Sequence, residues 1–204
     1  MELEIFDFEQ GSPEWVQCRL GVVTASEFKA VLAKGEGKTR AKYLRTVAGE
    51  AVRGKPFERY SNDHMDRGHA EEDEARSLYT FLSENEVQRI GFMKRGRVGY
   101  SPDGLIGTAG LLEIKTKLDH LHIECLESDS VPTEHKHQCQ GGLWVSGREW
   151  IDFVSYCPGL PLFVKRVTRD EPYIARIKVE VDSFIEELDA LIAKINAYSH
   201  QRAA

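Results

Sequence analysis

Residues 111–117 constrain the fold more than any other part of the sequence. They read LLEIKTK, in which charged residues alternate with apolar or small ones, as in a β-strand with two different faces. Because successive side chains of a strand point to opposite faces, Glu113, Lys115 and Lys117 share one face. The other face carries Leu112, Ile114 and Thr116. Charged groups are costly to bury in an apolar strand, so the charged face indicates a functional site.

The residues before this strand allow the chain to reverse. Asp103 ends one predicted strand, and Glu113 lies within the next. Between them stand Gly104, Gly107 and Gly110. Glycine adopts the backbone conformations that tight reversals require. We therefore expect the two carboxylates to converge.

Two carboxylates and a lysine suit phosphodiester hydrolysis. Mg²⁺ prefers carboxylate and carbonyl oxygens, so Asp103 and Glu113 can anchor one or two ions. The amine of Lys115 can orient an attacking water and offset negative charge on phosphorus. The alternative is a surface hairpin in which Glu113 forms an ordinary ion pair with Lys115 or Lys117, worth at most ~1 kcal/mol.

Two other regions carry polar side chains that could join the site. Glu71 and Glu72 both border the apolar stripe of a predicted helix, and periodicity does not separate them. A solvated helix edge is the alternative for either acid. Gln138 lies one turn before Gly141 and Gly142, where a neighbouring backbone or a DNA strand could approach closely.

Histidine and cysteine do not form a convincing metal site in this sequence. His135, His137 and Cys139 alternate, but residues two apart on a helix diverge, which disfavours zinc. No C-x-x-C pair occurs, so the cysteines are expected to be reduced, buried thiols. The four cysteines are Cys18, Cys125, Cys139 and Cys157.

The order of predicted elements favours a mixed α/β fold. A capping-box pattern from Ser183 to Glu186 predicts the start of the last helix. A central mixed β-sheet flanked by helices, in one domain over residues 1–204, is the expected architecture. The predicted helices cover about 26–33, 39–52, 66–82, 132–145 and the region after 183, and the predicted strands cover 87–93, 97–101, 111–117, 150–156 and 162–168.

The amino-acid composition excludes fewer classes of protein than the motifs do. With 41% hydrophobic and 29% charged residues, the chain suits one globular domain. No run approaches the ~20 apolar residues of a membrane helix, and the acidic N-terminus resembles neither a secretory signal nor a transit peptide. A soluble intracellular protein is therefore the default expectation. The net charge of −6 excludes a uniformly basic surface, but a local basic groove remains compatible with it.

Five short motifs occur in order along nearly the whole chain. They are W-x-x-x-R-L-G-V-V-T-A-S-E at residues 15–27, G-x-x-x-E at 68–72, S-P-D-G at 101–104, L-E-I-K at 112–115 and Q-x-Q-x-x-x-W-V at 138–145. Together they resemble the phage lambda exonuclease family, the YqaJ-type viral recombinases. Each motif is modest alone, but the set keeps the Asp-to-Glu-to-Lys spacing of that family.

The resemblance implies roles for the residues of the hairpin. Asp103 and Glu113 would bind Mg²⁺ with the backbone carbonyl of Ile114. Two ions are implied, with Mn²⁺ as a possible substitute. Lys115 would position the attacking water.

The resemblance also assigns three positions outside the hairpin. Glu72, rather than Glu71, matches the family's helix carboxylate near the second metal, and Gln138 matches its motif glutamine. Met65 falls where an apolar wedge would separate the strands, although a core position is the alternative.

A pocket for a 5′-phosphate is implied at Arg19, Ser26 and Ser101. Such a pocket makes physical sense because a guanidinium grips a terminal phosphate with two hydrogen bonds, and hydroxyl groups complete the cradle. The alternative for Arg19 is a structural role on a partly buried helix.

For the whole protein, the resemblance implies a restriction-endonuclease-like core and a ring-shaped homotrimer. The implied activity is processive 5′-to-3′ degradation of one strand of linear double-stranded DNA, leaving 3′ single-stranded overhangs. A single-strand annealing protein is the implied partner, and the cytoplasm of a bacterial host is the implied location. The competing interpretations are a RecB-like or resolvase-type endonuclease on the same core and a catalytically inactive DNA-binding module. Isolated cysteines disfavour an iron–sulfur variant of the former.

Overall fold

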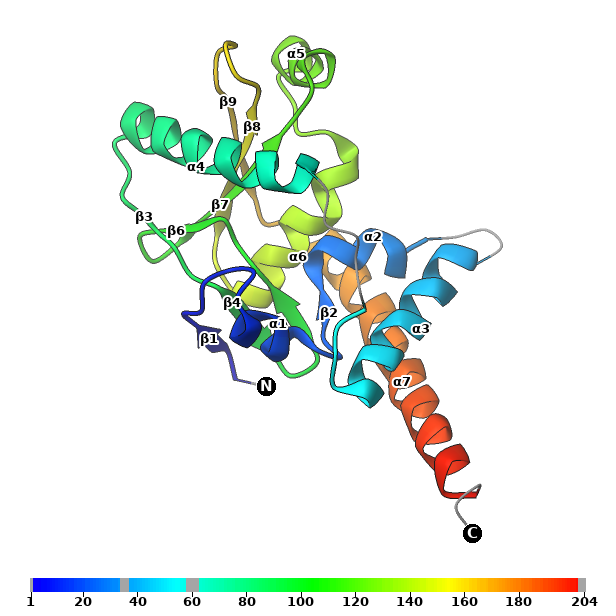
Figure 1. The fold of residues 1–204 in the computed structure, drawn as a ribbon. Helices are drawn as coiled ribbons and strands as arrows, with labels where there is room; N and C mark the ends of the chain where they lie inside the picture. Colours follow the sequence, from blue (N-terminus) through cyan, green and yellow to red (C-terminus); the bar gives the residue numbers. More distant parts are fainter. Residues whose placement is uncertain (1, 34–36, 58–62, 202–204) are drawn as a thin grey trace.

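The computed structural model describes residues 2–33, 37–57 and 63–201, with side chains described in 2–33, 37–57 and 70–198. Within these residues the larger sheet has five strands in the order β3-β6-β7-β8-β9 (Figure 1). Strands β7 and β8 run parallel, and the other neighbours are antiparallel. The strands are β3 (Val87–Gln88), β6 (Gly104–Ile106), β7 (Gly110–Thr116), β8 (Trp150–Tyr156) and β9 (Phe163–Thr168).

A smaller sheet lies beside the first. Its order is β1-β4-β5-β2, and the pair β2–β5 is parallel while the other pairs are antiparallel. The strands are β1 (Glu4–Phe6), β2 (Val23–Thr24), β4 (Phe92–Arg95) and β5 (Val98–Tyr100). The chain therefore passes from the smaller sheet to the larger one between β5 and β6, which is where Asp103 lies.

The prediction of one strand over residues 87–93 is wrong, because the chain changes sheets within it. β3 pairs with β6, whereas β4 pairs with β1 and β5. At the break, the N–H of Gly91 donates to the carbonyl of Phe6 over 3.0 Å. A Cβ at Gly91 would lie 2.1 Å from the carbonyl oxygen of Phe8, so only glycine fits this close approach.

Helices cover both sheets. In Figure 1, α4 crosses the larger sheet on one side, while α6 lies on the other side, next to α2 and α7. The long helix α7 packs along α3 and carries the C-terminus away from the sheets. The helical elements are α1 (Pro13–Arg19), η1 (Ala25–Glu27), α2 (Phe28–Val31), α3 (Lys38–Arg53), α4 (Asp63–Ser83), α5 (Asp119–Ser128), η2 (Thr133–His135), α6 (Lys136–Ser146) and α7 (Glu171–Gln201).

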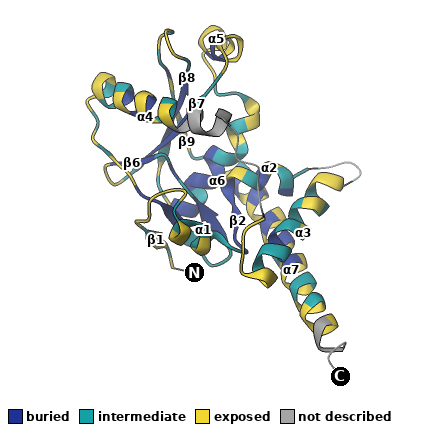
Figure 2. Cartoon of the chain, in the orientation of Figure 1, coloured by how far each residue is buried: buried dark blue, intermediate teal, exposed yellow. Residues whose placement is uncertain are grey.

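The two faces of the larger sheet pack in different clusters. On one face, Leu112 and Ile114 of β7 join Tyr79 of α4. On the other face, Leu111 joins Leu143 of α6 in the main core. Each such side chain contributes about 1.5–3 kcal/mol when it is fully buried. Figure 2 shows the resulting buried centre around β7, β8 and α6. The alternation predicted for β7 is confirmed, and its charged face is the one turned toward α6.

Helix α7 begins earlier than the capping-box pattern predicted. It starts at Glu171, and the side chain of Asp170 accepts a hydrogen bond from the N–H of Tyr173 over 3.1 Å. Ser183 lies inside the helix instead of capping it. Two elements, α5 (Asp119–Ser128) and the short β6, were not predicted from the sequence.

Other expectations are confirmed. The strand predicted at 150–156 has those bounds in β8, and α3 ends at Gly54, which adopts a left-handed conformation. All four cysteines are free thiols, although Cys18 and Cys157 are only partly buried. No helix within the described part of the chain is both long enough and apolar enough to cross a membrane.

Candidate active site

The β6–β7 hairpin brings the two predicted acids together. Asp103 precedes β6, and its N–H donates to the carbonyl of Leu112 over 3.1 Å. Its carboxylate Oδ2 accepts a hydrogen bond of 2.6 Å from the N–H of Ile114. Asp103 is therefore fixed by backbone hydrogen bonds on both sides of Glu113. The convergence that the three glycines predicted is present.

Glu113 is the buried centre of the site, with 1% of its surface exposed. Its Oε1 lies 2.5 Å from Nζ of Lys115 and also accepts a hydrogen bond from the amide of Gln138. Its Oε2 accepts a hydrogen bond of 2.7 Å from the hydroxyl of Tyr100. Such a set of donors compensates the cost of burying a carboxylate.

The buried charges strongly perturb one another. Burial and then the negative charge of Glu113 raise the pKa of Asp103 well above its ordinary value. Burial alone would lower the pKa of Lys115, but the charges of Glu113 and Asp103 outweigh it and raise that pKa, so the ammonium stays protonated. Burial also raises the pKa of Tyr100 well above its ordinary value, so the phenol remains a hydrogen-bond donor.

The donor chemistry of this site fits a divalent cation. Asp103 and Glu113 present hard oxygen ligands, and their mutual repulsion in a buried place would be relieved by a positive ion. The described side chains contain no cluster of three or more His, Cys, Asp or Glu that could hold a metal. A metal here would thus rely on two carboxylates together with backbone oxygen and water, which is how Mg²⁺ is commonly bound.

Helix α4 supplies a third acid, and the structure separates Glu71 from Glu72. Glu72 forms an ion pair with Arg76, and its charge contributes to the raised pKa of Asp103. Glu71 instead lies near Tyr156, whose pKa is raised by burial, then by Glu74 and more weakly by Glu71. Glu72, Arg76 and Asp103 line one cavity of about 590 Å³, so Glu72 is the acid that faces the site.

Arg76 is a site residue that the sequence analysis missed. It is 8% exposed, and its Nε donates to the backbone carbonyl of Asp103 over 2.9 Å. Its Nη1 lies 2.5 Å from the carboxylate of Asp73. Arg76 therefore fastens α4, with Glu72, to the backbone of the hairpin acid. No local pattern in the sequence distinguishes Arg76 from the other charged residues of this helix.

Two glycines allow α6 to bring Gln138 to Glu113. A Cβ at Gly141 would lie 2.5 Å from the ring of Phe28, and one at Gly142 would lie 2.7 Å from Cζ of Tyr100. The close approach suggested by this glycine pair is therefore made to aromatic side chains of the protein. In this packed position of α6, the amide of Gln138 donates to Glu113.

The three residues matched to a 5′-phosphate pocket are partly brought together. Arg19 donates to the hydroxyl of Ser101 over 2.7 Å, and its guanidinium lies 3.9 Å from the ring centroid of Trp15. The hydroxyl of Ser26 instead lies 3.2 Å from that of Thr24. Arg19 and Thr24 line a common pocket of about 350 Å³, and Ser26 contacts Thr24.

The remaining candidates do not join the site in the described residues. Met65 lies in α4, where its side chain falls outside the described part. His135 lies 3.1 Å from the amine of Lys117, and His137 stacks on Tyr173, so the two rings have separate partners. Burial and then the nearby lysines lower the pKa of His135 to about 4.

Comparison with known proteins places the chain in a family. Residues 14–149 match the YqaJ-like viral recombinase domain. An alkaline exonuclease from Laribacter hongkongensis, solved alone and in complex with dAMP, is similar with 34% identity and a TM-score of 0.86, over 93% of this chain and 99% of that one. A phage-related exonuclease from Haemophilus somnus 129PT has a similar fold, with 16% identity and a TM-score of 0.64, over 85% of this chain and 96% of that one.

No curated protein sequence matches the chain significantly. The matched range contains both hairpin acids, the lysine, the helix acid and the motif glutamine. The fold has the restriction-endonuclease-like core that was expected. The family match and the 34% identity over nearly the whole chain confirm the resemblance predicted from the five motifs, and the chain belongs to the YqaJ-like viral recombinase family.

Proposed function

We propose that this protein is a Mg²⁺-dependent 5′-to-3′ exonuclease that degrades one strand of linear double-stranded DNA. That it is a deoxyribonuclease follows from its family and from its likeness to an alkaline exonuclease. The observation that carries the finer proposal is the cluster of Asp103, Glu113 and Lys115 in the β6–β7 region, in which Glu113 is buried and the other two are partly buried.

The carboxylates of Asp103 and Glu113 would hold the cation, together with the carbonyl of Ile114, and Glu72 would serve a second ion. When bound, the cation supplies polarisation of the phosphodiester and a lowered pKa for the attacking water. Mn²⁺ has the same preference for oxygen ligands and should substitute.

Lys115 contributes the positive charge of the site. Its ammonium remains protonated beside Glu113, so it can donate hydrogen bonds to the attacking water and to a phosphate oxygen. A fixed donor in a buried site stabilises the developing negative charge more strongly than it would in water. Gln138 orients Glu113 through its amide, and Arg76 holds the backbone of Asp103.

The preference for a 5′-phosphorylated end is proposed from the arrangement around Arg19. Its guanidinium stacks on Trp15 and donates to Ser101, which directly precedes the Pro102-Asp103 pair. A guanidinium can bind a terminal phosphate with two hydrogen bonds, and a neighbouring hydroxyl can add a third. The pocket would thus hold the strand end a short distance from Asp103.

The products and partners are proposed by analogy with the family. Removal of nucleotides from the 5′ end leaves a 3′ single-stranded overhang, which a single-strand annealing protein would receive for recombination. We propose a ring-shaped homotrimer whose channel lining carries the basic groups, which reconciles DNA binding with the net charge of −6. The bacterial cytoplasm is the proposed location.

The test is digestion of three DNA substrates: linear duplex with a 5′-phosphate, linear duplex with a 5′-hydroxyl, and closed circles. We expect Mg²⁺-dependent release of nucleotides from linear DNA, fastest with the 5′-phosphate. Cleavage of circles would instead indicate an endonuclease. Binding without hydrolysis would indicate an inactive module.

Lys115→Ala should abolish hydrolysis while leaving the protein folded. The matched control is Lys165→Ala, which removes a lysine of β9 that is paired with Asp129. This variant should keep its activity. Substantial activity in Lys115→Ala would remove the chemical basis of the proposal.

A further inference from the structure

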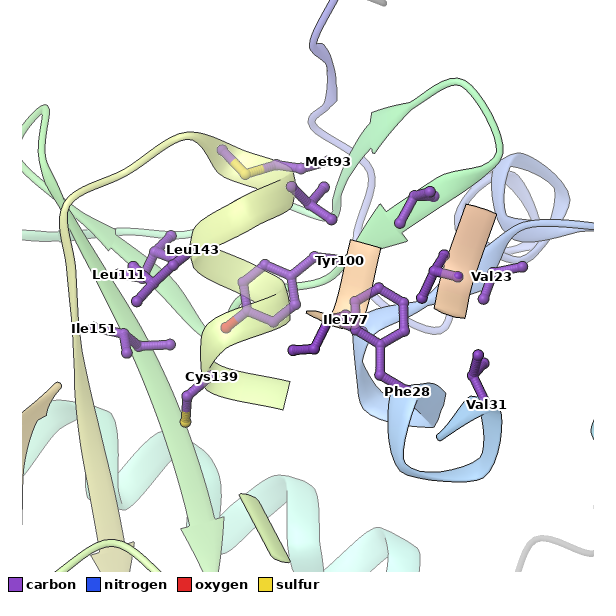
Figure 3. Close-up of a cluster of buried hydrophobic side chains, with 14 of the residues drawn as sticks. Val23, Phe28, Val31, Met93, Tyr100, Leu111, Cys139, Leu143, Ile151 and Ile177 are labelled. Atoms are coloured by element: carbon purple, nitrogen blue, oxygen red, sulfur yellow. The ribbon is translucent and has the colours of Figure 1, made fainter. Parts of the chain in front are cut away.

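Tyr100 ends β5 and is 1% exposed, directly beside the proposed metal site. Its hydroxyl donates to Oε2 of Glu113 over 2.7 Å. Figure 3 shows the ring of Tyr100 within the main core, against helix α6. Tyr100 therefore packs its ring against apolar side chains and directs its hydroxyl at the carboxylate of Glu113. It links the apolar core to the proposed metal site.

The ring of Tyr100 has little freedom to move. Gly142 of α6 approaches it so closely that an added Cβ would lie 2.7 Å from Cζ, the atom that carries the hydroxyl. The same core cluster contains Leu143 and Phe28. In a densely packed interior, such neighbours hold a ring in one place. The hydroxyl therefore has a fixed position relative to Glu113.

The two oxygens of Glu113 are held differently. Oε1 faces Lys115 and Gln138, both of which are needed for the proposed reaction. Oε2 accepts its hydrogen bond from Tyr100, which lies on a different sheet. Tyr100 thus holds the carboxylate oxygen for which no contact with Lys115 or Gln138 is found.

We propose that Tyr100 is a positioning residue of the metal site, because its hydroxyl sets the orientation in which Glu113 meets a divalent cation. This inference rests on the proposed metal site. Groups that orient metal ligands typically alter metal affinity or activity by about 10- to 100-fold when they are removed. Tyr100 would act through Glu113 and would not itself touch the DNA.

The chain offers a matched control for the loss of one buried phenol–carboxylate hydrogen bond. Tyr79 is also 1% exposed, and its hydroxyl donates to Oδ2 of Asp152 over 2.7 Å. Tyr79 and Asp152 lie in the contact between α4 and β8, and Asp152 is paired with Arg166. Tyr79→Phe and Tyr100→Phe should therefore cost similar stability, but only the second changes the metal site.

The experiment is isothermal titration of Mn²⁺ into the full chain, without DNA, for the parent, Tyr100→Phe, Tyr79→Phe and Glu113→Gln. We expect the Kd of Tyr100→Phe to rise about tenfold. Tyr79→Phe should keep the parent Kd, and Glu113→Gln should lose the site. In hydrolysis assays, Tyr100→Phe should recover much of the parent rate when the metal concentration is raised.

The outcomes separate this inference from the function on which it rests. If the parent binds no Mn²⁺, or if Glu113→Gln binds it like the parent, the proposed metal site is wrong. If the site exists but Tyr100→Phe binds Mn²⁺ as tightly as the parent or more tightly, the positioning role is wrong. An equal loss of affinity in Tyr79→Phe would also overturn it, since a general loss of stability would then explain both.

Discussion

Replacing Gly142 by alanine should damage the active site far more than it damages stability. The new methyl would lie 2.7 Å from Cζ of Tyr100. Carbon atoms in contact normally lie about 3.5–4.0 Å apart, so α6 or the phenol must move by about 1 Å. Either movement disturbs Glu113, since α6 carries Gln138 and the phenol donates to the other carboxylate oxygen.

The two effects of Gly142→Ala have different sizes. Overpacking of a core typically costs about 1–3 kcal/mol, and the better helix propensity of alanine returns about 1 kcal/mol. The net loss of about 0–2 kcal/mol should lower the melting temperature by no more than about 8 °C in a chain of this size. A misplacement of about 1 Å at reacting groups, however, can cost about 100-fold in rate.

Urea denaturation and digestion of end-labelled duplex DNA measure the two effects separately. The control is Gly49→Ala in α3, where an added Cβ meets nothing within 4 Å. That substitution should stabilise the protein by roughly 0.5–1 kcal/mol and leave the rate unchanged. If folded Gly142→Ala hydrolyses DNA at the parent rate, the argument that this glycine allows the site to assemble is refuted.

Three further predictions concern the charged groups. Arg19→Ala should reduce the rate advantage of 5′-phosphorylated over 5′-hydroxyl duplexes, measured as a ratio of rates; an unchanged ratio would exclude Arg19 from end recognition. Asp103→Asn should abolish hydrolysis and, in EDTA, melt no lower than the parent, because one of two neighbouring buried negative charges is removed; a large fall in melting temperature would contradict this. Arg76→Met should destabilise the fold by about 1–3 kcal/mol and slow hydrolysis, because the carbonyl of Asp103 loses its buried donor; parent-like values of both would show that Arg76 is not needed.

The parts of the fold that could be predicted are those with a strong local pattern. β8 is rich in aromatic and β-branched residues and was predicted with its observed bounds. β7 shows strict alternation, and its two faces were assigned as they are found. The convergence of Asp103 and Glu113 followed from the glycines between them.

The missed elements lack such a pattern. In α5, the residues that face the interior are His122 and Cys125, whereas Leu121 and Ile123 are exposed. Apolar periodicity therefore pointed away from the true buried face. His122 is compatible with the core because its ring nitrogens bond to Ser155 and to a backbone carbonyl, and no local pattern reveals those distant partners.

The site residues that were not predicted were missed for the same reason. Tyr100 and Arg76 contact Glu113 and Asp103 through hydrogen bonds between separate elements. Each looks like an ordinary strand or helix residue in its own segment. The sequence could predict that the two acids and the lysine lie together, because they belong to one hairpin, but it could not predict which distant residues hold them in place. The local pattern of residues along the chain does not reveal contacts between distant elements.

The register of β7 ties the chemistry to folding. Ile114 packs on the α4 side of the sheet while Glu113 faces α6, so a shift of one residue would exchange them. The hydrogen bond from the N–H of Ile114 to Asp103 can form only in the observed register, and it places the second carboxylate beside the first. The apolar packing that stabilises this register of β7 therefore also brings the two acids together. The same register turns Glu113 toward α6, where Gln138 donates to it.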